Sequence, residues 1–202
     1  MTFLTIGIIL GLSAGLTPGP LLTLVISETL QHDVKSGIKV ALAPVITDLP
    51  IVAVSIFILT RAANSSTTLG IISLAGGFFI LYMGWEHLQT KGIKLSLQDV
   101  KPQSMRKGIL ANILSPYPYL FWISVGAPTM AKAIAYSSVA PLAFLGSFYS
   151  LLVGSKIVLA LLTGKSKSFL SGKVYIYIMR FLGVVLCGFA LTLFRESFEL
   201  FF

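Results

Sequence analysis

Residues 7–25 read GIILGLSAGLTPGPLLTLV, an uncharged and mostly apolar stretch with two prolines in its middle. A helix that crosses a bilayer takes about 20 apolar residues, so the stretch has the length of a membrane span. Each proline removes a backbone donor and clashes with the carbonyl group four residues earlier. Because lipid offers no water to the freed polar groups, such breaks occur only where protein or a water-filled cavity satisfies them. We therefore expect an interrupted membrane helix beside a cavity.

The composition of the whole chain agrees with a membrane protein. Of its 202 residues, 55% are hydrophobic and 11% are charged, with a mean hydropathy of +0.91. Ordinary soluble domains have about 25% charged residues, which excludes most soluble enzymes, disordered regulators and nucleic-acid binders. The formal net charge of +8 comes from basic residues that mostly lie in short loops between apolar runs. Anionic lipid headgroups explain that placement, and no nucleic-acid partner is expected.

Six apolar runs predict an all-α polytopic protein with six transmembrane helices in a single membrane domain, 1–202. The runs lie at roughly 3–27, 38–60, 67–88, 108–130, 139–162 and 176–195. Strands of a membrane barrel would instead alternate polar and apolar residues over about ten positions. No Lys or Arg precedes Lys35, so the first run is expected to be a retained helix and not a cleavable signal peptide. Residues 196–202 are expected to form a short outside tail.

Lys and Arg residues predict the orientation, because cytoplasmic loops retain positive charge. Eleven of the fifteen lie in or just beyond the loops after the first, third and fifth runs, and three lie on the opposite side. We expect a multi-pass protein of the cytoplasmic (inner) membrane with both termini outside. The segment at about 86–107 is then a cytoplasmic linker between two halves of three helices, at about 1–90 and 108–202.

The two halves share a short motif. TPGPLL at 17–22 is matched by SPYPYL at 115–120, a shift of 98 residues. Because three helices are an odd number, the second half enters the membrane from the opposite side. Inverted repeats with interrupted helices in corresponding positions are typical of secondary transporters, in which the breaks mark the substrate site. The alternative is a pair of ordinary proline kinks.

The breaks supply the first candidate substrate-binding residues. If a helix restarts after each break, its free N–H groups form a positive dipole end that can hold a carboxylate, near Leu21 in the first half and after Pro118 in the second. Gly19 has no Cβ, so a ligand can approach its backbone closely. Asn112 is expected to donate into the same cavity, with an interhelical hydrogen bond as the alternative. The candidates from the breaks are Thr17, Pro18, Gly19, Pro20, Asn112, Ser115 and Pro116.

Two ionisable residues, Asp48 and Lys156, lie well inside the apolar runs. A charge at the bilayer centre costs at least about 2.5–3.5 kcal/mol, so such residues are functional candidates. We expect Asp48 to bind a substrate ammonium group or to carry the coupling proton, and Lys156 to balance charge or meet a carboxylate. The alternative is a structural ion pair between the two side chains.

Metal, redox and catalytic chemistry lack suitable residues in the sequence. The single cysteine, Cys187, excludes an internal disulfide and a thiolate cluster. His32 and His87 lie at the ends of runs and far apart in sequence, where we expect them to reach toward the headgroups. A membrane-embedded enzyme would need a nucleophile with a base or a metal within the spans. We expect no enzyme activity, no metal site and no cofactor.

Glycines follow one face of the first run at every fourth position, from Gly7 through Gly11 and Gly15 to Gly19. Small residues at this spacing let two helix backbones approach closely in lipid. We favour packing against another helix of the same chain, with a subunit interface in a homo-oligomer as the alternative. A weaker stripe of the same kind contains Gly70, Gly77 and Gly84.

Together these motifs resemble the LysE/RhtB family of amino-acid exporters. The resemblance covers nearly the whole chain and rests on Gly11-x3-Gly15-x-Thr17-Pro18-Gly19-Pro20, residues 37–48, the Gly84 region, Gly108-x3-Asn112-x2-Ser115-Pro116 and Arg180-x2-Gly183-x4-Gly188. The chain departs from the family pattern at Ser115, where an Asn is usual, and at Tyr117, where a Lys is usual.

The resemblance implies proton-driven export of a small amino acid or related metabolite. A zwitterion suits the candidate residues, with its carboxylate near 18–21 or at Lys156 and its ammonium group at Asp48. The wider superfamily also holds cation exporters, so heavy-metal efflux is an alternative, although the spans lack the set of Cys and His ligands that a soft cation prefers. A non-transporting scaffold is a further alternative, which leaves Asp48 and Lys156 only a pairing role. A channel fits two internal breaks less well than a carrier.

Overall fold

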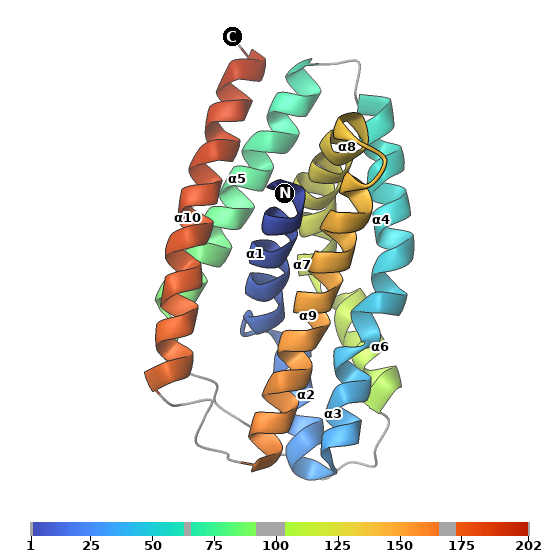
Figure 1. Cartoon of the computed structure of the whole chain (residues 1–202), viewed down its shortest axis with the longest axis vertical. Coiled ribbons are helices and arrows are strands. Elements are labelled where there is room, and N and C mark those ends of the chain that lie inside the picture. The colour runs from blue at the N-terminus through green and yellow to red at the C-terminus, as the bar shows by residue number, and fades with distance from the viewer. Residues whose placement is uncertain (1, 63–65, 92–103, 166–172, 202) are drawn as a thin grey trace.

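The structure is a computed structural model that describes residues 2–62, 66–91, 104–165 and 173–201. Every regular element in these ranges is a helix, and the long helices lie side by side along one axis (Figure 1). The all-α prediction is confirmed for this part of the chain.

The first predicted span is built from two helices. α1 (Thr2–Leu16) and α2 (Pro20–Gln31) meet at a bend of 60°. The bend follows from the sequence, because neither of the two prolines can donate a hydrogen bond back to a carbonyl of α1. After α2 the chain turns at Asp33, whose carboxylate accepts a hydrogen bond from the backbone N–H of Ser36 and so caps the next helix, α3 (Val34–Ala41).

Among the described residues, four stretches of helix are long and apolar enough to cross a membrane, and the bent pair makes a fifth if it is a single span. Besides α1 with α2, they are α3 with α4 (Ala43–Ala62), α5 (Ser66–Leu88), α9 (Ala140–Lys165) and α10 (Lys173–Phe201). The predicted span at 108–130 is divided among α6 (Ser104–Leu114), α7 (Pro116–Phe121), the π-helix η1 (Trp122–Gly126) and α8 (Ala127–Tyr136). The protein is therefore a polytopic membrane protein, and the count of six spans stays a prediction.

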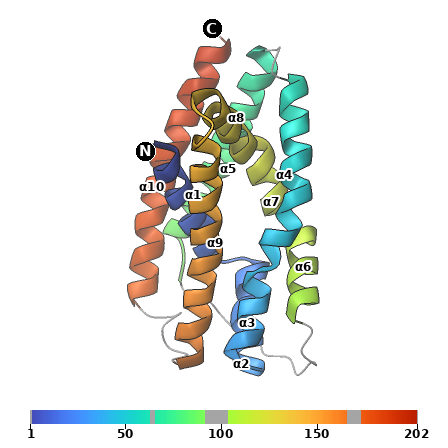
Figure 2. The same cartoon turned by 45° about the vertical axis from the view of Figure 1, so that its right-hand side comes forward.

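The connections alternate between the two ends of the bundle. The turn between α2 and α3 and the start of α6 lie at the lower end of Figure 1, whereas the turn between α8 and α9 and the C-terminus lie at the upper end (Figures 1 and 2). We call the lower end the α2–α3 end. It is the end that the distribution of Lys and Arg predicts to face the cytoplasm.

The glycine stripe of the first run packs within the chain, as favoured above. A Cβ at Gly7, Gly11 or Gly15 would fall against the backbone or serine side chains of α9, so only glycine lets α1 and α9 approach this closely. Gly19 does not belong to this contact, since a Cβ there meets nothing within 4 Å. The weaker stripe packs α5 against α10, where Gly84 faces Gly183 and Cys187.

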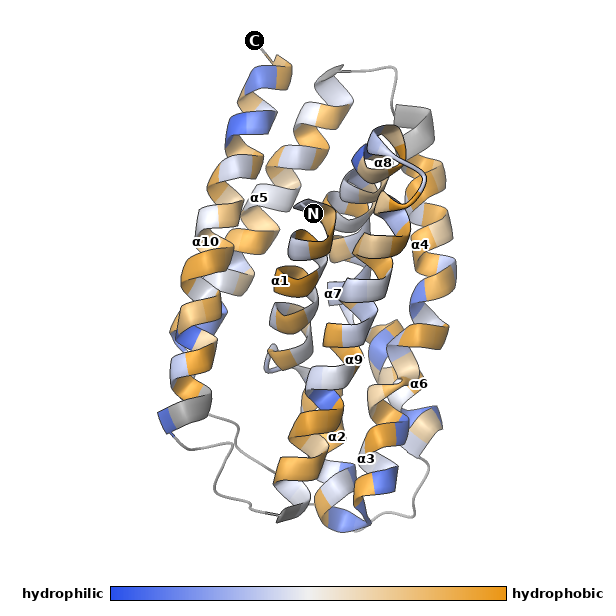
Figure 3. Cartoon of the chain, in the orientation of Figure 1, coloured by the Kyte–Doolittle hydropathy of each residue, from blue (hydrophilic) through white to orange (hydrophobic). Residues whose placement is uncertain are grey.

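The outer surface of the bundle is apolar, as lipid contact requires. Hydrophobic residues cover the outer faces of the long helices, and hydrophilic residues gather mainly toward their ends (Figure 3). Large apolar side chains such as Leu49 and Phe181 are each 68% exposed. Soluble monomers rarely expose contiguous apolar surface of this kind.

One predicted boundary is wrong. α10 continues to Phe201, so residues 196–201 are helical and do not form a tail. The acidic residues there are paired, Glu196 with Lys132 of α8 at 2.6 Å and Glu199 with Arg195 at 2.9 Å, which favours continuation of the helix. Within the predicted linker at about 86–107, α5 extends to Leu88 and α6 begins at Ser104, and the linker itself stays a prediction. Two of its five Lys and Arg residues, Lys94 and Lys101, lie outside the described residues.

Candidate functional site

The first break leaves the start of α2 without a side-chain cap. Gly19 is the N-cap residue, in an extended conformation with φ −158° and ψ −179°, and no side chain bonds to the N–H groups that follow. Pro20 suits the first helical position, because the N–H that it lacks would have no helical partner there. Thr23 donates to the carbonyl of Gly19 at 2.9 Å. The N–H groups of Leu21 and Leu22 precede that bond, and they form the positive end of α2.

At the second break a local side chain caps the start of the following helix. α6 ends at Leu114, and the Ser115 side chain accepts a hydrogen bond from the backbone N–H of Tyr117 at 3.4 Å. Pro116 again occupies the first helical position. The prediction that a free helix start follows Pro118 is therefore wrong in position, since the helix restarts at Pro116 and its start is already capped.

The helix after the second break widens into a π-helix. The N–H of Ala127 donates to the carbonyl of Trp122, five residues back. Pro128 follows directly and has no N–H to continue α-helical bonding to Ser124. Single π turns of this kind are frequent at functional sites. Here the wide turn contains Trp122, which is fully buried.

A cavity of about 100 Å³ lies between the two breaks. A single water needs roughly 10–15 Å³ on this measure, so the cavity holds more than one small group. Of the predicted site residues, seven line it: Thr17, Gly19, Pro20, Asp48, Asn112, Ser115 and Lys156. Pro18 and Pro116 do not line it, and they act by breaking the helices.

Asp48 sits in this cavity among neutral donors. Its side chain is 4% exposed and accepts hydrogen bonds from Asn112 Nδ2 at 2.8 Å, Trp122 Nε1 at 3.4 Å and the Tyr149 hydroxyl at 3.4 Å. Asn112 also donates to Thr47 Oγ1 at 2.6 Å. Asn112 thus both lines the cavity and makes the interhelical bond that was the alternative for it. The carboxylate is oriented by three helices that meet at the cavity.

Lys156 is bound to backbone and not to Asp48. Its Nζ donates to the carbonyls of Ala14 and Gly15, at 3.1 Å each, in the last turn of α1. A cation at a helix C-terminus satisfies free carbonyls and stabilises the helix dipole. The ion pairs among the described residues lie elsewhere, so the alternative of a structural Asp48–Lys156 pair is wrong. Both charges still line one cavity.

His87 is buried and does not reach the headgroups, contrary to expectation. It is 0% exposed, and its Nε2 lies 2.9 Å from the hydroxyl of Thr17 at the first break. The single hydroxyl proton of Thr17 is donated to the carbonyl of Ser13 at 2.7 Å, so His87 Nε2–H is the donor to Thr17. His87 is buried because the rotation of α5 about its axis places this side chain against the end of α1. The neighbouring Glu86 accepts from the hydroxyl of Tyr117, a cavity residue, at 3.1 Å.

Sequence analysis missed the aromatic side of the site. Trp122 and Tyr117 line the cavity, and Tyr149 reaches the Asp48 carboxylate from α9. Hydropathy gives no sign of which aromatic residues in an apolar run face inward. The sequence signals that did locate site residues were the helix break beside Asn112 and the rarity of a charge such as Asp48 within an apolar run.

No group of three or more His, Cys, Asp or Glu side chains able to hold a metal ion occurs among the described residues. The polar groups that line the cavity are one carboxylate, amide and hydroxyl groups, the Lys156 ammonium group, and backbone groups at the ends of helices. These are groups suited to an organic ligand that carries both signs of charge.

Comparisons with known proteins place this cavity in a family of transporters. No curated protein and no solved structure matches the chain. The model of the LysE type translocator family matches residues 12–197, a range that contains both breaks, Asp48 and Lys156. The chain therefore belongs to the LysE type translocator family.

Proposed function

We propose that this protein is a secondary active transporter that exports small amino acids or related metabolites across the cytoplasmic membrane, driven by protons. Membership of the translocator family establishes the broader role of a membrane transporter. The observation that carries the finer proposal is the charge pattern of the cavity, in which an uncapped helix start and a carboxylate face the same space.

A zwitterion matches that pattern. Its carboxylate is accommodated at the N–H groups of Leu21 and Leu22, where the open space at Gly19 leaves room for it. Its ammonium group is accommodated at Asp48, whose present partners are all neutral donors. Lys156 supports the carboxylate end indirectly, because it neutralises the negative end of α1 that otherwise faces the same cavity.

Asp48 is also the residue that we assign to the coupling proton. A carboxylate buried without a cationic contact is costly, so it favours binding either a proton or the substrate ammonium group. Exchange of one for the other at the same oxygen atoms couples the two movements. Rocking of the two predicted repeats, about 1–90 and 108–202, would then expose the cavity alternately to the two sides.

The test is an export assay in cells that express the chain and in cells with empty vector, both fed mixed dipeptides to raise internal amino acids. Mass spectrometry of the medium should find one or a few amino acids enriched, and a proton uncoupler should remove the enrichment. Absence of any enrichment, with the protein detected in the membrane, would overturn the proposal. A parallel measurement of heavy-metal tolerance then tests cation efflux, and failure of both assays leaves the scaffold interpretation.

Asp48→Asn is the decisive variant. Export should fall to the empty-vector level, because the amide can neither take the proton nor balance an ammonium group, while the protein remains folded and inserted. Asp33→Asn is the matched control, since it makes the same chemical change at an exposed helix cap where Asn serves as well as Asp. Normal export by Asp48→Asn would remove this residue from the mechanism.

A further inference from the structure

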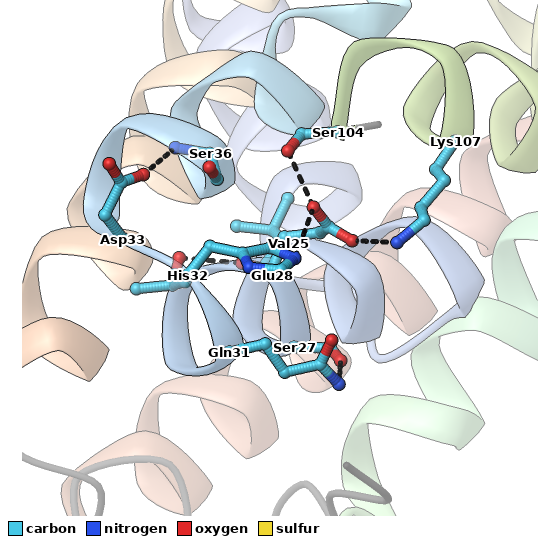
Figure 4. A network of polar contacts seen from close by, with 10 residues as sticks. Val25, Ser27, Glu28, Gln31, His32, Asp33, Ser36, Ser104 and Lys107 are labelled. Carbon is cyan, nitrogen blue, oxygen red and sulfur yellow. Dashed lines mark hydrogen bonds and ion pairs between the residues drawn. The ribbon is translucent and has the colours of Figure 1, made fainter. Parts of the chain in front are cut away.

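A second buried carboxylate lies outside the cavity. Glu28 of α2 is 1% exposed and accepts hydrogen bonds from Ser104 Oγ at 2.6 Å and from Lys107 Nζ at 2.5 Å. Figure 4 shows this carboxylate between the two donors, which both come from α6. His32 Nε2 lies 3.8 Å away on the next turn of α2. We call Glu28, Ser104 and Lys107 the Glu28 cluster.

The Glu28 cluster lies between the cavity and the α2–α3 end of the bundle. Glu28 follows the cavity residue Leu21 by seven residues along α2, which is about 10 Å at the helical rise. Lys107 precedes the cavity residue Asn112 by five residues along α6, or about 8 Å. The α2–α3 turn and the start of α6 share the lower end of Figure 1. Both helices therefore lead from the cavity to the cluster and then to that end.

The space between the cavity and the cluster is closed by tight packing. Val25 and Val40 are both 0% exposed and belong to one apolar cluster. A Cβ at Gly108 would lie 3.1 Å from the backbone of Val40 and 3.1 Å from the Ala43 side chain, so α6 presses its backbone against α3 and α4. Nothing of substrate size passes here unless α6 separates from α2 and α3.

We propose that the Glu28 cluster is a gate, which holds the substrate cavity closed toward the α2–α3 end and opens to admit substrate from that side; this inference rests on the proposed transport function. The cluster forms hydrogen bonds across the interface between α2, in the first half of the chain, and α6, in the second. The two halves cannot part at this end without breaking it.

The chemistry of the cluster suits a contact that must form and break. Charge-assisted hydrogen bonds are strong while the carboxylate stays buried. Lys107 is already 26% exposed, so its ammonium group can return to water when the helices part. Lys156, by contrast, is 3% exposed, and its ammonium group binds the backbone inside the site. The Glu28 cluster therefore closes firmly without making the open state prohibitively costly.

The experiment measures access to the cavity and needs no transport. Ala14→Cys, at a small cavity-lining residue, is placed in a Cys187→Ala background, and its reaction with a membrane-impermeant methanethiosulfonate is followed in vesicles of both orientations. Glu28→Gln should raise the reaction rate from the α2–α3 end roughly tenfold, about 1.4 kcal/mol, since the closed state loses charge-assisted hydrogen bonds. The rate from the other end should not rise.

Two further variants serve as controls. Glu28→Gln with Lys107→Met removes both charges, so no unpaired ion remains in the interface, and should react as fast as Glu28→Gln. Glu196→Gln breaks the ion pair between α8 and α10 at the opposite end, and should leave the rate from the α2–α3 end unchanged.

Unchanged access in Glu28→Gln and in the double variant, or an equal rise from both ends, would overturn the gate. If the unmodified chain exports no amino acid but Glu28→Gln still opens the cavity from one end, the gate stands and the proposed substrate fails. If export is proton-driven and the access rate does not change, the proposed function stands and the gate fails.

Discussion

The two helix breaks have the same proline motif, but their helix starts differ. At the first, Gly19 precedes α2 and offers no side chain, so the N–H groups of Leu21 and Leu22 face the cavity without a cap. At the second, the Ser115 side chain caps the start of α7. The comparison teaches that one sequence pattern leaves a helix start without a side-chain cap where the N-cap residue is glycine, and with one where that residue is serine.

The ends of the preceding helices differ in the same sense. In the last turn of α1 the carbonyl of Ser13 accepts locally from Thr17, whereas the carbonyls of Ala14 and Gly15 accept from Lys156 of α9, which is distant in sequence. The end of α6 is satisfied locally, by the N–H of Ser115 bonding to the carbonyl of Asn112 at 3.2 Å. The first break therefore depends in part on a distant tertiary contact, whereas the second is held by local hydrogen bonds and positions Asn112 and Trp122 around Asp48.

The largest effect is expected where the first break depends on its distant partner. Lys156→Met should lower the free energy of unfolding by about 2 kcal/mol, because two carbonyls of α1 lose a charged donor. It should also abolish export, since the negative end of α1 then faces the substrate carboxylate. The thermal midpoint in detergent and the export assay measure the two effects.

Lys132→Met is the control for this prediction. It makes the same substitution at a lysine whose side chain is 54% exposed in its ion pair. Exposed ion pairs contribute little to the free energy of unfolding. An equal thermal shift in both variants would show that α1 does not depend on Lys156 for its C-terminal end.

What the sequence could predict here is set by how local each signal is. Pro18, Pro20 and Pro116 stand in two Pro-x-Pro motifs, which remove helical donors close together, so both breaks follow from the sequence, whereas the isolated Pro50 lies inside α4. Asp48 and Lys156 stand out because a charge in an apolar run is rare. Their partners do not follow, because which residue of α4 or α9 faces which neighbour depends on the rotation of each helix in the bundle.

His87 and Glu28 show the same limit at the ends of the runs. Both lie where an apolar run stops, and a headgroup position was the expectation for His87. In the fold each is at most 1% exposed, because its helix turns it toward another helix that offers a hydrogen-bond partner. Position along a span is thus readable from sequence, whereas the inward or outward face is not when the whole run is apolar.

A second prediction converts the first break into the second. Gly19→Ser places a hydroxyl at an N-cap with extended backbone and no atom within 4 Å of the new Cβ, so the side chain fits and can cap α2. The cap should raise stability slightly, by a few tenths of a kcal/mol. Export should fall roughly tenfold, about 1.4 kcal/mol, because the cap competes with the substrate carboxylate for the same N–H groups. Higher stability with undiminished export would separate the α2 start from substrate binding.

The smallest effect on export is expected at the second break, where Ser115 already caps the helix. Ser115→Ala should lower stability by about 1 kcal/mol, the usual cost of losing an N-cap serine. Export should fall only about twofold, a change of roughly 0.4 kcal/mol, because the proposed carboxylate site at the start of α2 stays intact. Thermal midpoints and export rates of the two variants should be measured side by side. Stability should fall mainly in Ser115→Ala, and export should fall mainly in Gly19→Ser. A larger loss of export in Ser115→Ala than in Gly19→Ser would mean that the substrate is held at the second break, and that the serine hydroxyl serves the ligand in place of the helix.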